Sequence, residues 1–137
     1  MKSFEISVGP EIDSAIIDER TFISYQIFFE MHCGCAIVVG KLGEFSFPAG
    51  SYVYTGSAKK RIRGRILRHL SSTKKLRWHI DYLLAPRGTV ISRIKLFDKE
   101  ECEVNKETKG EIIVPGFGAT DCKSKCSSHL KLLNRAA

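Results

Sequence analysis

Residues 52–69 read YVYTGSAKKRIRGRILRH, and the pattern changes at Gly56. Before this glycine, β-branched and aromatic residues predict a strand over residues 51–56. After it, apolar residues recur at every fourth position, as on one face of a helix. These apolar residues are Ile62, Ile66 and Leu70. The stretch therefore predicts a strand that turns at a glycine into a helix with a cationic face.

A junction of this kind can hold a phosphate group. Gly56 lets the backbone approach a ligand closely, and a helix N-terminus offers unpaired N–H groups. Arg65 on the predicted helix can contact phosphate oxygens with two N–H donors at once. The alternative is an ordinary strand–turn–helix junction with a solvated arginine face, and the stretch alone leaves both interpretations open.

The net charge of +7 arises entirely from residues 59–77, which hold nine Lys or Arg and no acidic residue. The rest of the chain has 13 basic and 15 acidic residues. A local basic patch indicates a partner with a phosphate backbone, hence nucleic acid, although a solvated helix face is the alternative. We assign to nucleic-acid binding the residues Gly56, Ser57, Lys59, Lys60, Arg61, Arg63, Arg68, Lys74, Lys75 and Arg77.

The flanking sequence predicts further strands and short helices. Residues 22–31 and 36–39 are rich in β-branched and aromatic residues, and we expect them to form a hairpin around residues 32–35. Together with residues 51–56 they would make a small sheet of three adjacent strands. We also expect helices near 78–84 and within 98–109, a strand over 90–97, and a loop with a terminal helical turn over 115–133.

The length of 137 residues predicts one domain. No apolar run approaches the roughly 18 residues of a membrane span, and the N-terminus lacks a secretory signal, so we expect a cytoplasmic protein. In a reducing compartment the five cysteines would be free thiols or metal ligands. We expect an N-terminal extension over 1–21, the domain over 22–133 and a tail over 134–137.

The segment Tyr54-Thr55-Gly56, with Arg65 and His69 on the following helix, resembles the second half of the GIY-YIG nuclease motif. Ile23-Ser24-Tyr25 stands in the position of the GIY half, and Glu101 where such nucleases place a metal-binding glutamate. The likeness is to a single-domain branch that also occurs fused to endonuclease III-like DNA glycosylases. The pieces that carry it are GKLG (40–43), FPAG (47–50), YVY (52–54), WHIDY (78–82), EC (101–102), and FG (117–118) through DC (121–122) to SHL (128–130).

This resemblance implies an α+β fold, with a small three-stranded antiparallel sheet flanked by helices, and a one-metal cleavage of DNA. Tyr25 would be the general base, with a pKa lowered by Arg65, which also binds the scissile phosphate. Glu101 would bind Mg²⁺ or Mn²⁺. Tyr54 and His69 would orient the phosphate or the attacking water.

Some positions stay open in this comparison. Ile23 and Thr55 depart from the motif, although neither change removes a catalytic side chain. One extra residue separates Tyr54 from Arg65, which makes Arg63 a rival for the arginine role. The metal ligand is ambiguous by one or two positions, because Glu100 and Glu103 flank Glu101, which the resemblance selects. The acidic cluster could also be a solvated helix face.

His79 has two interpretations. It could line the active-site cleft, or it could belong to an amphipathic helix on which Trp78 and Tyr82 pack one turn apart.

The chain also contains the pattern Cys122-x3-Cys126-x2-His129, with Cys102 as a possible fourth ligand. Thiolates and an imidazole suit tetrahedral zinc. The alternatives are a packed structural turn and a thiol-linked function. Cys33-Gly34-Cys35 indicates no more than small residues at a turn.

Three functions follow from these patterns. The first is a metal-dependent DNA endonuclease, and the second is a nucleic-acid-binding module that cleaves nothing. Both predict binding that weakens as salt rises. The third is a zinc-stabilised interaction domain, which predicts stoichiometric zinc and behaviour insensitive to salt.

Overall fold

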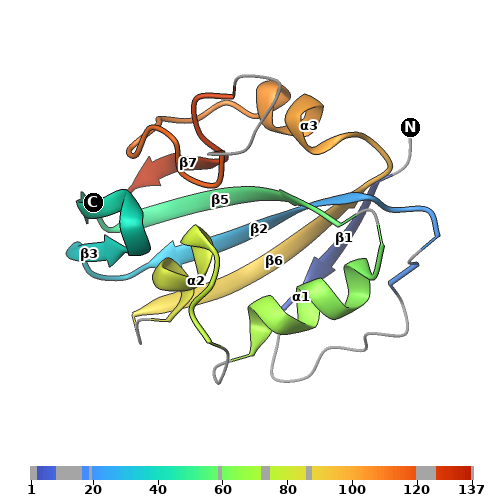
Figure 1. Ribbon diagram of the computed structural model, residues 1–137, viewed down its shortest axis with the longest axis horizontal. Helices are drawn as coiled ribbons and strands as arrows, with labels where there is room; N and C mark the ends of the chain where they lie inside the picture. The colour runs from blue at the N-terminus through green and yellow to red at the C-terminus, as the bar shows by residue number, and fades with distance from the viewer. Residues whose placement is uncertain are drawn as a thin grey trace.

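The structure, a computed structural model, describes residues 3–8, 17–18, 20–58, 60–71, 75–85, 88–119 and 126–136. Its centre is a five-stranded antiparallel sheet in the order β1-β6-β2-β5-β7, and β3 and β4 form a separate two-stranded sheet (Figure 1). The strands are β1 Ser3–Ser7, β2 Ser24–Met31, β3 Cys35–Val39, β4 Gly43–Phe47, β5 Gly50–Ser57, β6 Thr89–Phe97 and β7 Leu130–Arg135. The helices are the 3₁₀ turn η2 Gly40–Leu42 and the α-helices α1 Ile62–Leu70, α2 His79–Leu84 and α3 Glu101–Glu107.

The five-stranded sheet corrects the fold class expected from the sequence. The described chain is mostly β, so the α+β arrangement of a small three-stranded sheet flanked by helices is wrong. The predicted hairpin is also wrong, because β3 pairs with β4, from Cys35 opposite Phe47, while β2 lies between β5 and β6. Local composition shows that a segment is extended, but it does not show which segment it pairs with.

Both edge strands come from segments where no strand was expected. β7 pairs with β5, with Leu130 opposite Tyr54, so the predicted loop with a helical turn at the end of the chain is wrong. Leu130 and Leu132 are buried and Lys131 is less so, which is the two-residue alternation of a strand. β1, within residues 1–21, pairs with β6.

The remaining predicted elements agree with the structure in type and place. α2 and α3 lie within the segments predicted as helices, and β6 extends over the predicted strand at 90–97. α1 begins at Ile62, because β5 continues through Ser57 and the cationic helix starts later than the glycine turn suggested. α1 is the longest described helix, at nine residues, so no membrane-spanning helix occurs in the described part of the chain.

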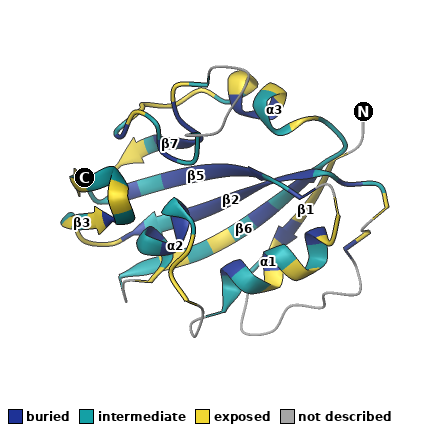
Figure 2. Cartoon of the chain, viewed as in Figure 1, coloured by how far each residue is buried: buried dark blue, intermediate teal, exposed yellow. Residues whose placement is uncertain are grey.

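β2 is the central strand, and both of its faces are covered (Figure 2). Tyr25 contacts His69 of α1 on one face. Gln26 points to the other face, where its amide nitrogen donates to the hydroxyls of Thr55 and of Thr108 at the end of α3. α1 and α3 therefore lie on opposite faces. Burial on both sides explains why Ile27, Phe28 and Phe29 are apolar at consecutive positions instead of alternating with polar residues.

Candidate active site

A pocket of about 300 Å³ opens where the ends of β2 and β5 meet all three α-helices. Most of its lining side chains are polar, and they come from segments far apart in the sequence. The lining residues are Tyr25, Tyr54, Ser57, Arg65, Arg77, Trp78, His79, Glu101 and Gly118. The structure thus brings the predicted residues Tyr25, Tyr54, Arg65, His79 and Glu101 to one place, whereas Trp78 and Gly118 were not assigned to the site from the sequence.

Tyr25 lies in this pocket directly opposite Gly56 of β5. A Cβ atom at Gly56 would be 2.5 Å from the Tyr25 hydroxyl oxygen and 2.6 Å from the ring carbon that carries it. The glycine is therefore required by the tyrosine ring. The sequence interpretation was different, because it had Gly56 and the helix N-terminus hold a phosphate. Neither Gly56 nor residues 62–64 at the start of α1 line the pocket.

Replacement of Gly56 by alanine is expected to destabilise the protein by about 1–3 kcal/mol, because the new methyl group overpacks the buried Tyr25 ring. Gly64, in α1, is the matched control, because no heavy atom lies within 4 Å of a Cβ built there. Gly64→Ala is expected to stabilise by up to about 1 kcal/mol through helix propensity. Urea denaturation of the two variants measures both changes, and equal effects would contradict the steric argument.

The Tyr25 hydroxyl is 2.6 Å from Nε2 of His69, which lies behind it and outside the pocket lining. Burial raises the pKa of Tyr25 well above its ordinary value of 10.0, and Tyr54 raises it further, while Arg65 lowers it by less. The phenolate form of Tyr25, which the sequence interpretation expected Arg65 to stabilise, is therefore disfavoured. The imidazole of His69 is instead placed to take the phenol proton.

Contacts to Ser57 and Trp78 help to hold Arg65 at the pocket. Its guanidinium donates to the Ser57 carbonyl oxygen at 2.8 Å and lies 4.7 Å from the centre of the Trp78 ring. Arg63 instead donates to the Ile17 carbonyl oxygen at 2.8 Å and does not line the pocket. Between the two rivals, Arg65 is the arginine that a ligand in this pocket would meet.

Arg68, assigned to nucleic-acid binding from the sequence, is used internally. Its guanidinium makes two hydrogen bonds to the carboxylate of Asp81, at 3.0 and 2.9 Å, and lies 4.0 Å from the Trp78 ring centre. Asp81 is fully buried and also accepts the backbone N–H groups of Arg77 and Trp78, each at 2.9 Å. This role of Asp81 was not predicted from the sequence, where the only signal was an acidic residue among the apolar residues Ile80, Leu83 and Leu84.

The other basic residues that the sequence assigned to nucleic-acid binding fall into two groups. Lys60, Arg61, Lys75 and Arg77 are exposed, and Arg77 also lines the pocket. Lys59 and Lys74 lie outside the described residues. Of these four exposed cations, Arg77 is the one that lies at the pocket.

His79 enters the pocket from the start of α2. Its Nδ1 accepts the backbone N–H of Gly118 at 2.8 Å, and its ring lies edge-on to Phe117, with centroids 5.5 Å apart. The neighbouring Trp78 ring contacts His69, with centroids 5.5 Å apart. The aromatic wall formed by Trp78 and His79 therefore joins α1, α2 and the 117–118 turn around the pocket.

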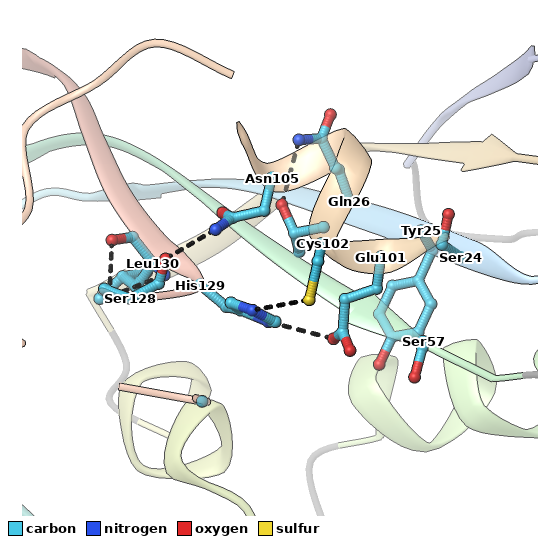
Figure 3. A network of polar contacts seen from close by, with 12 residues as sticks. Ser24, Tyr25, Gln26, Ser57, Glu101, Cys102, Asn105, Ser128, His129 and Leu130 are labelled. Atoms are coloured by element: carbon cyan, nitrogen blue, oxygen red, sulfur yellow. Dashed lines mark hydrogen bonds and ion pairs between the residues drawn. The ribbon is translucent and has the colours of Figure 1, made fainter. Parts of the chain in front are cut away.

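Glu101 approaches the pocket from the first turn of α3 and is held by His129 (Figure 3). Its Oε2 is 3.1 Å from Nδ1 of His129, and Nε2 of the same ring is 3.9 Å from Sγ of Cys102. Cys126 lies in the same cluster. Of the predicted zinc ligands, Cys126, His129 and Cys102 come together, and Cys122 lies outside the described residues.

The comparisons with known proteins give one match. The family model described as a domain of unknown function, DUF123, matches residues 24–137. The chain belongs to this family. The DUF123 match begins at the first residue of β2, so it includes every residue that lines the pocket and the Cys102, Cys126 and His129 cluster. No curated protein and no solved structure matches the DUF123 chain.

Proposed function

We propose that this DUF123 domain is a divalent-metal-dependent DNA endonuclease of the GIY-YIG type, acting in the cytoplasm in DNA repair or processing. The observation that carries the proposal is the single pocket that holds a phenol, a guanidinium and a carboxylate from Tyr25, Arg65 and Glu101. Hydrolysis of a phosphodiester needs a proton acceptor for water, a cation for the developing phosphate charge and a metal ligand.

Arg65 binds the scissile phosphate in this proposal. The Ser57 carbonyl and the Trp78 ring hold its guanidinium in place, so little conformational entropy is lost when phosphate binds. Arg77 adds a second cation at the exposed side of the pocket. Two guanidinium groups above a polar pocket suit an anionic backbone better than a neutral substrate.

Glu101 suits a hard divalent cation such as Mg²⁺ or Mn²⁺. It is the one acidic side chain among the described residues that line the pocket, and 25% of its side chain is exposed. Mg²⁺ is commonly held by one or two carboxylates together with water and substrate phosphate. A metal bound there stabilises negative charge on the phosphate oxygens.

Tyr25 and His69 form the proton path. As the attacking water bonds to phosphorus, one of its protons moves to the Tyr25 oxygen, and the phenol proton moves to Nε2 of His69. The phenol is neutral before and after this transfer, so its raised pKa is no obstacle. His69 gains the positive charge, and Tyr54, whose ring lies 6.2 Å from that of His69, borders the same region.

A non-catalytic nucleic-acid-binding module is the second candidate. The exposed residues Lys60, Arg61, Lys75 and Arg77 favour it, because exposed cations bind a phosphate backbone without any chemistry. Both candidates predict affinity that falls as salt rises, and cleavage separates them.

We expect Glu101→Gln to reduce Mg²⁺-dependent or Mn²⁺-dependent cleavage of labelled single-stranded, duplex, flapped and branched DNA by a factor on the order of 100 or more, because the metal loses its anionic ligand. Glu103→Gln is the matched control on the same helix, since Glu103 is exposed and does not line the pocket. It should cleave at the native rate.

Two results would change this assignment. If Glu103→Gln lost activity and Glu101→Gln kept it, the metal ligand would be wrong. If the native protein bound every DNA with strong salt dependence and cut none of them with either metal, the nuclease function would be wrong. The non-catalytic binding module would then be the better assignment.

A further inference from the structure

We propose that Cys102, Cys126 and His129 bind a zinc ion, and that the bound ion orients Glu101 through the His129 ring. The first half concerns a metal site separate from the Mg²⁺ site. The second half rests on the proposed function, because it assigns Glu101 a task in cleavage.

The ligand atoms are already close to a metal-binding geometry. One Cys Sγ from each of Cys102 and Cys126 and a ring nitrogen of His129 all lie within 4.8 Å of one another. Sγ of Cys102 is 3.9 Å from Nε2 of His129. Tetrahedral zinc, with its Zn–S and Zn–N bond lengths, places such a sulfur and nitrogen about 3.6 Å apart, so for Cys102 and His129 a shift of a few tenths of an ångström suffices.

The backbone around His129 fixes its position. The His129 N–H donates to the Phe117 carbonyl at 2.8 Å, and the Thr55 N–H donates to the His129 carbonyl at 2.9 Å. The side-chain amide of Asn105, one turn along α3 from Cys102, donates to the Ser128 carbonyl at 2.8 Å. These bonds join the helix that carries Cys102 to the strand that follows His129, so two of the ligands are held together before metal binds.

The chemistry of the donors selects the metal. Two thiolates and an imidazole favour zinc over Mg²⁺ or Ca²⁺, which prefer oxygen ligands. Three protein ligands leave the fourth tetrahedral position for water or another donor.

Glu101 completes the arrangement as the partner of the metal-bound imidazole. Nε2 of His129 faces Cys102, and Nδ1 faces Glu101 Oε2 at 3.1 Å. A metal on Nε2 fixes the tautomer with hydrogen on Nδ1, which then donates to the carboxylate. Because Glu101 also lines the pocket, the zinc site and the pocket are connected through one hydrogen bond.

The test measures zinc without any DNA. We expect the native protein, purified from zinc-containing medium and dialysed, to retain about one zinc per chain by elemental analysis. Cobalt added to the metal-free protein should give thiolate-to-cobalt charge-transfer absorption. Cys102→Ser and Cys126→Ser should each lose zinc, while Cys33→Ser, which removes an exposed thiol outside the cluster, should retain it.

Glu101→Gln provides the test of the link to the pocket. A partner of a metal-bound histidine changes metal affinity by about 10–100-fold when it is replaced, so this variant should release zinc more readily than Glu103→Gln. Equal zinc affinity in these two variants would overturn the link, even if zinc is bound.

The zinc site itself is overturned if the native protein retains no zinc and cobalt produces no thiolate absorption, a result that needs no variant to fold. It is also overturned if both serine variants bind zinc as the native protein does. Stoichiometric zinc in a protein that cuts no DNA would remove the nuclease and leave the site. If the native protein retained no zinc and still cut DNA with Mg²⁺, the zinc site would be overturned and the nuclease function would stand.

Discussion

The Asp81→Asn variant is expected to unfold about 10 °C below the native protein, a loss of about 3 kcal/mol. Asp81 is fully buried and accepts hydrogen bonds from the Arg68 guanidinium and from the backbone of Arg77 and Trp78. The asparagine side chain of the variant is neutral, so it leaves the Arg68 guanidinium without its counter-charge. The side chain of Arg68 is 24% exposed, so water recovers part of the loss. Thermal unfolding followed by circular dichroism measures the change.

The effect should also depend on pH. Burial raises the pKa of Asp81, but the hydrogen bonds from Arg68, Trp78 and Arg77 outweigh it, so the pKa lies below its ordinary value of 3.8. A depressed pKa contributes stability above 3.8 that is lost as pH falls through the folded value. The difference between native protein and Asp81→Asn should therefore be full at neutral pH and shrink in strong acid.

Glu5→Gln is the control for this prediction. Glu5 pairs with Arg93 at 3.2 Å, but both side chains are more than two-fifths exposed, and such surface pairs contribute little to stability. Its unfolding temperature should stay near the native value. Comparable decreases in unfolding temperature in Asp81→Asn and Glu5→Gln would show that burial of the Asp81 carboxylate does not determine its contribution to stability.

The second large effect is expected for Tyr25→Phe, which should lower the cleavage rate by about 10²–10⁴-fold because it removes the group that passes the water proton to His69. Folding should be retained, since phenylalanine keeps the buried ring opposite Gly56. Single-turnover cleavage with saturating metal measures the chemical step, and DNA affinity should be unchanged.

Tyr52→Phe is the matched control for Tyr25→Phe. Tyr52 is equally buried, and its hydroxyl donates to the Pro48 carbonyl at 2.5 Å, but it does not line the pocket. Its cleavage rate should equal the native rate. If both variants cleaved normally, neither tyrosine would take part, and the proton path would have to be abandoned.

The pH profile separates the two forms of this mechanism. If a phenolate were the base, the rate would keep rising past pH 10, because burial raises the pKa of Tyr25 above 10.0. If His69 receives the proton through a neutral phenol, the rate should level off well below that range. A profile that still climbs past pH 10 would contradict the Tyr25–His69 path.

Local patterns in the sequence were enough to predict several elements. The strand and helix on either side of Gly56, the helices α2 and α3, and the strand β6 each show their own periodicity. The resemblance also selected Tyr25, Arg65 and Glu101, which the structure places around one pocket. Their catalytic roles stay predictions until cleavage is measured.

Strand pairing was not available from the same patterns. β3 pairs with β4, and β7 adds to β5. The residues of β3 show only that it can be extended, and the segment that contains β7 was predicted as a loop with a helical turn. The arginines illustrate the same limit, because Arg63, Arg65 and Arg68 belong to one short helix and have similar sequence surroundings. Only their neighbours in space separate them: Ile17, Ser57 and Asp81 accept their hydrogen bonds, respectively.

The residue types of this chain thus determine which ligands it can bind. A basic stretch can bind phosphate, a carboxylate can bind hard metals, and thiols can bind soft metals. Which of these groups act together depends on contacts between residues far apart in the sequence. His129 joins Glu101 to Cys102 only because β7 docks on β5 beside α3. Such contacts arise from packing of the whole sheet, and no local periodicity encodes them.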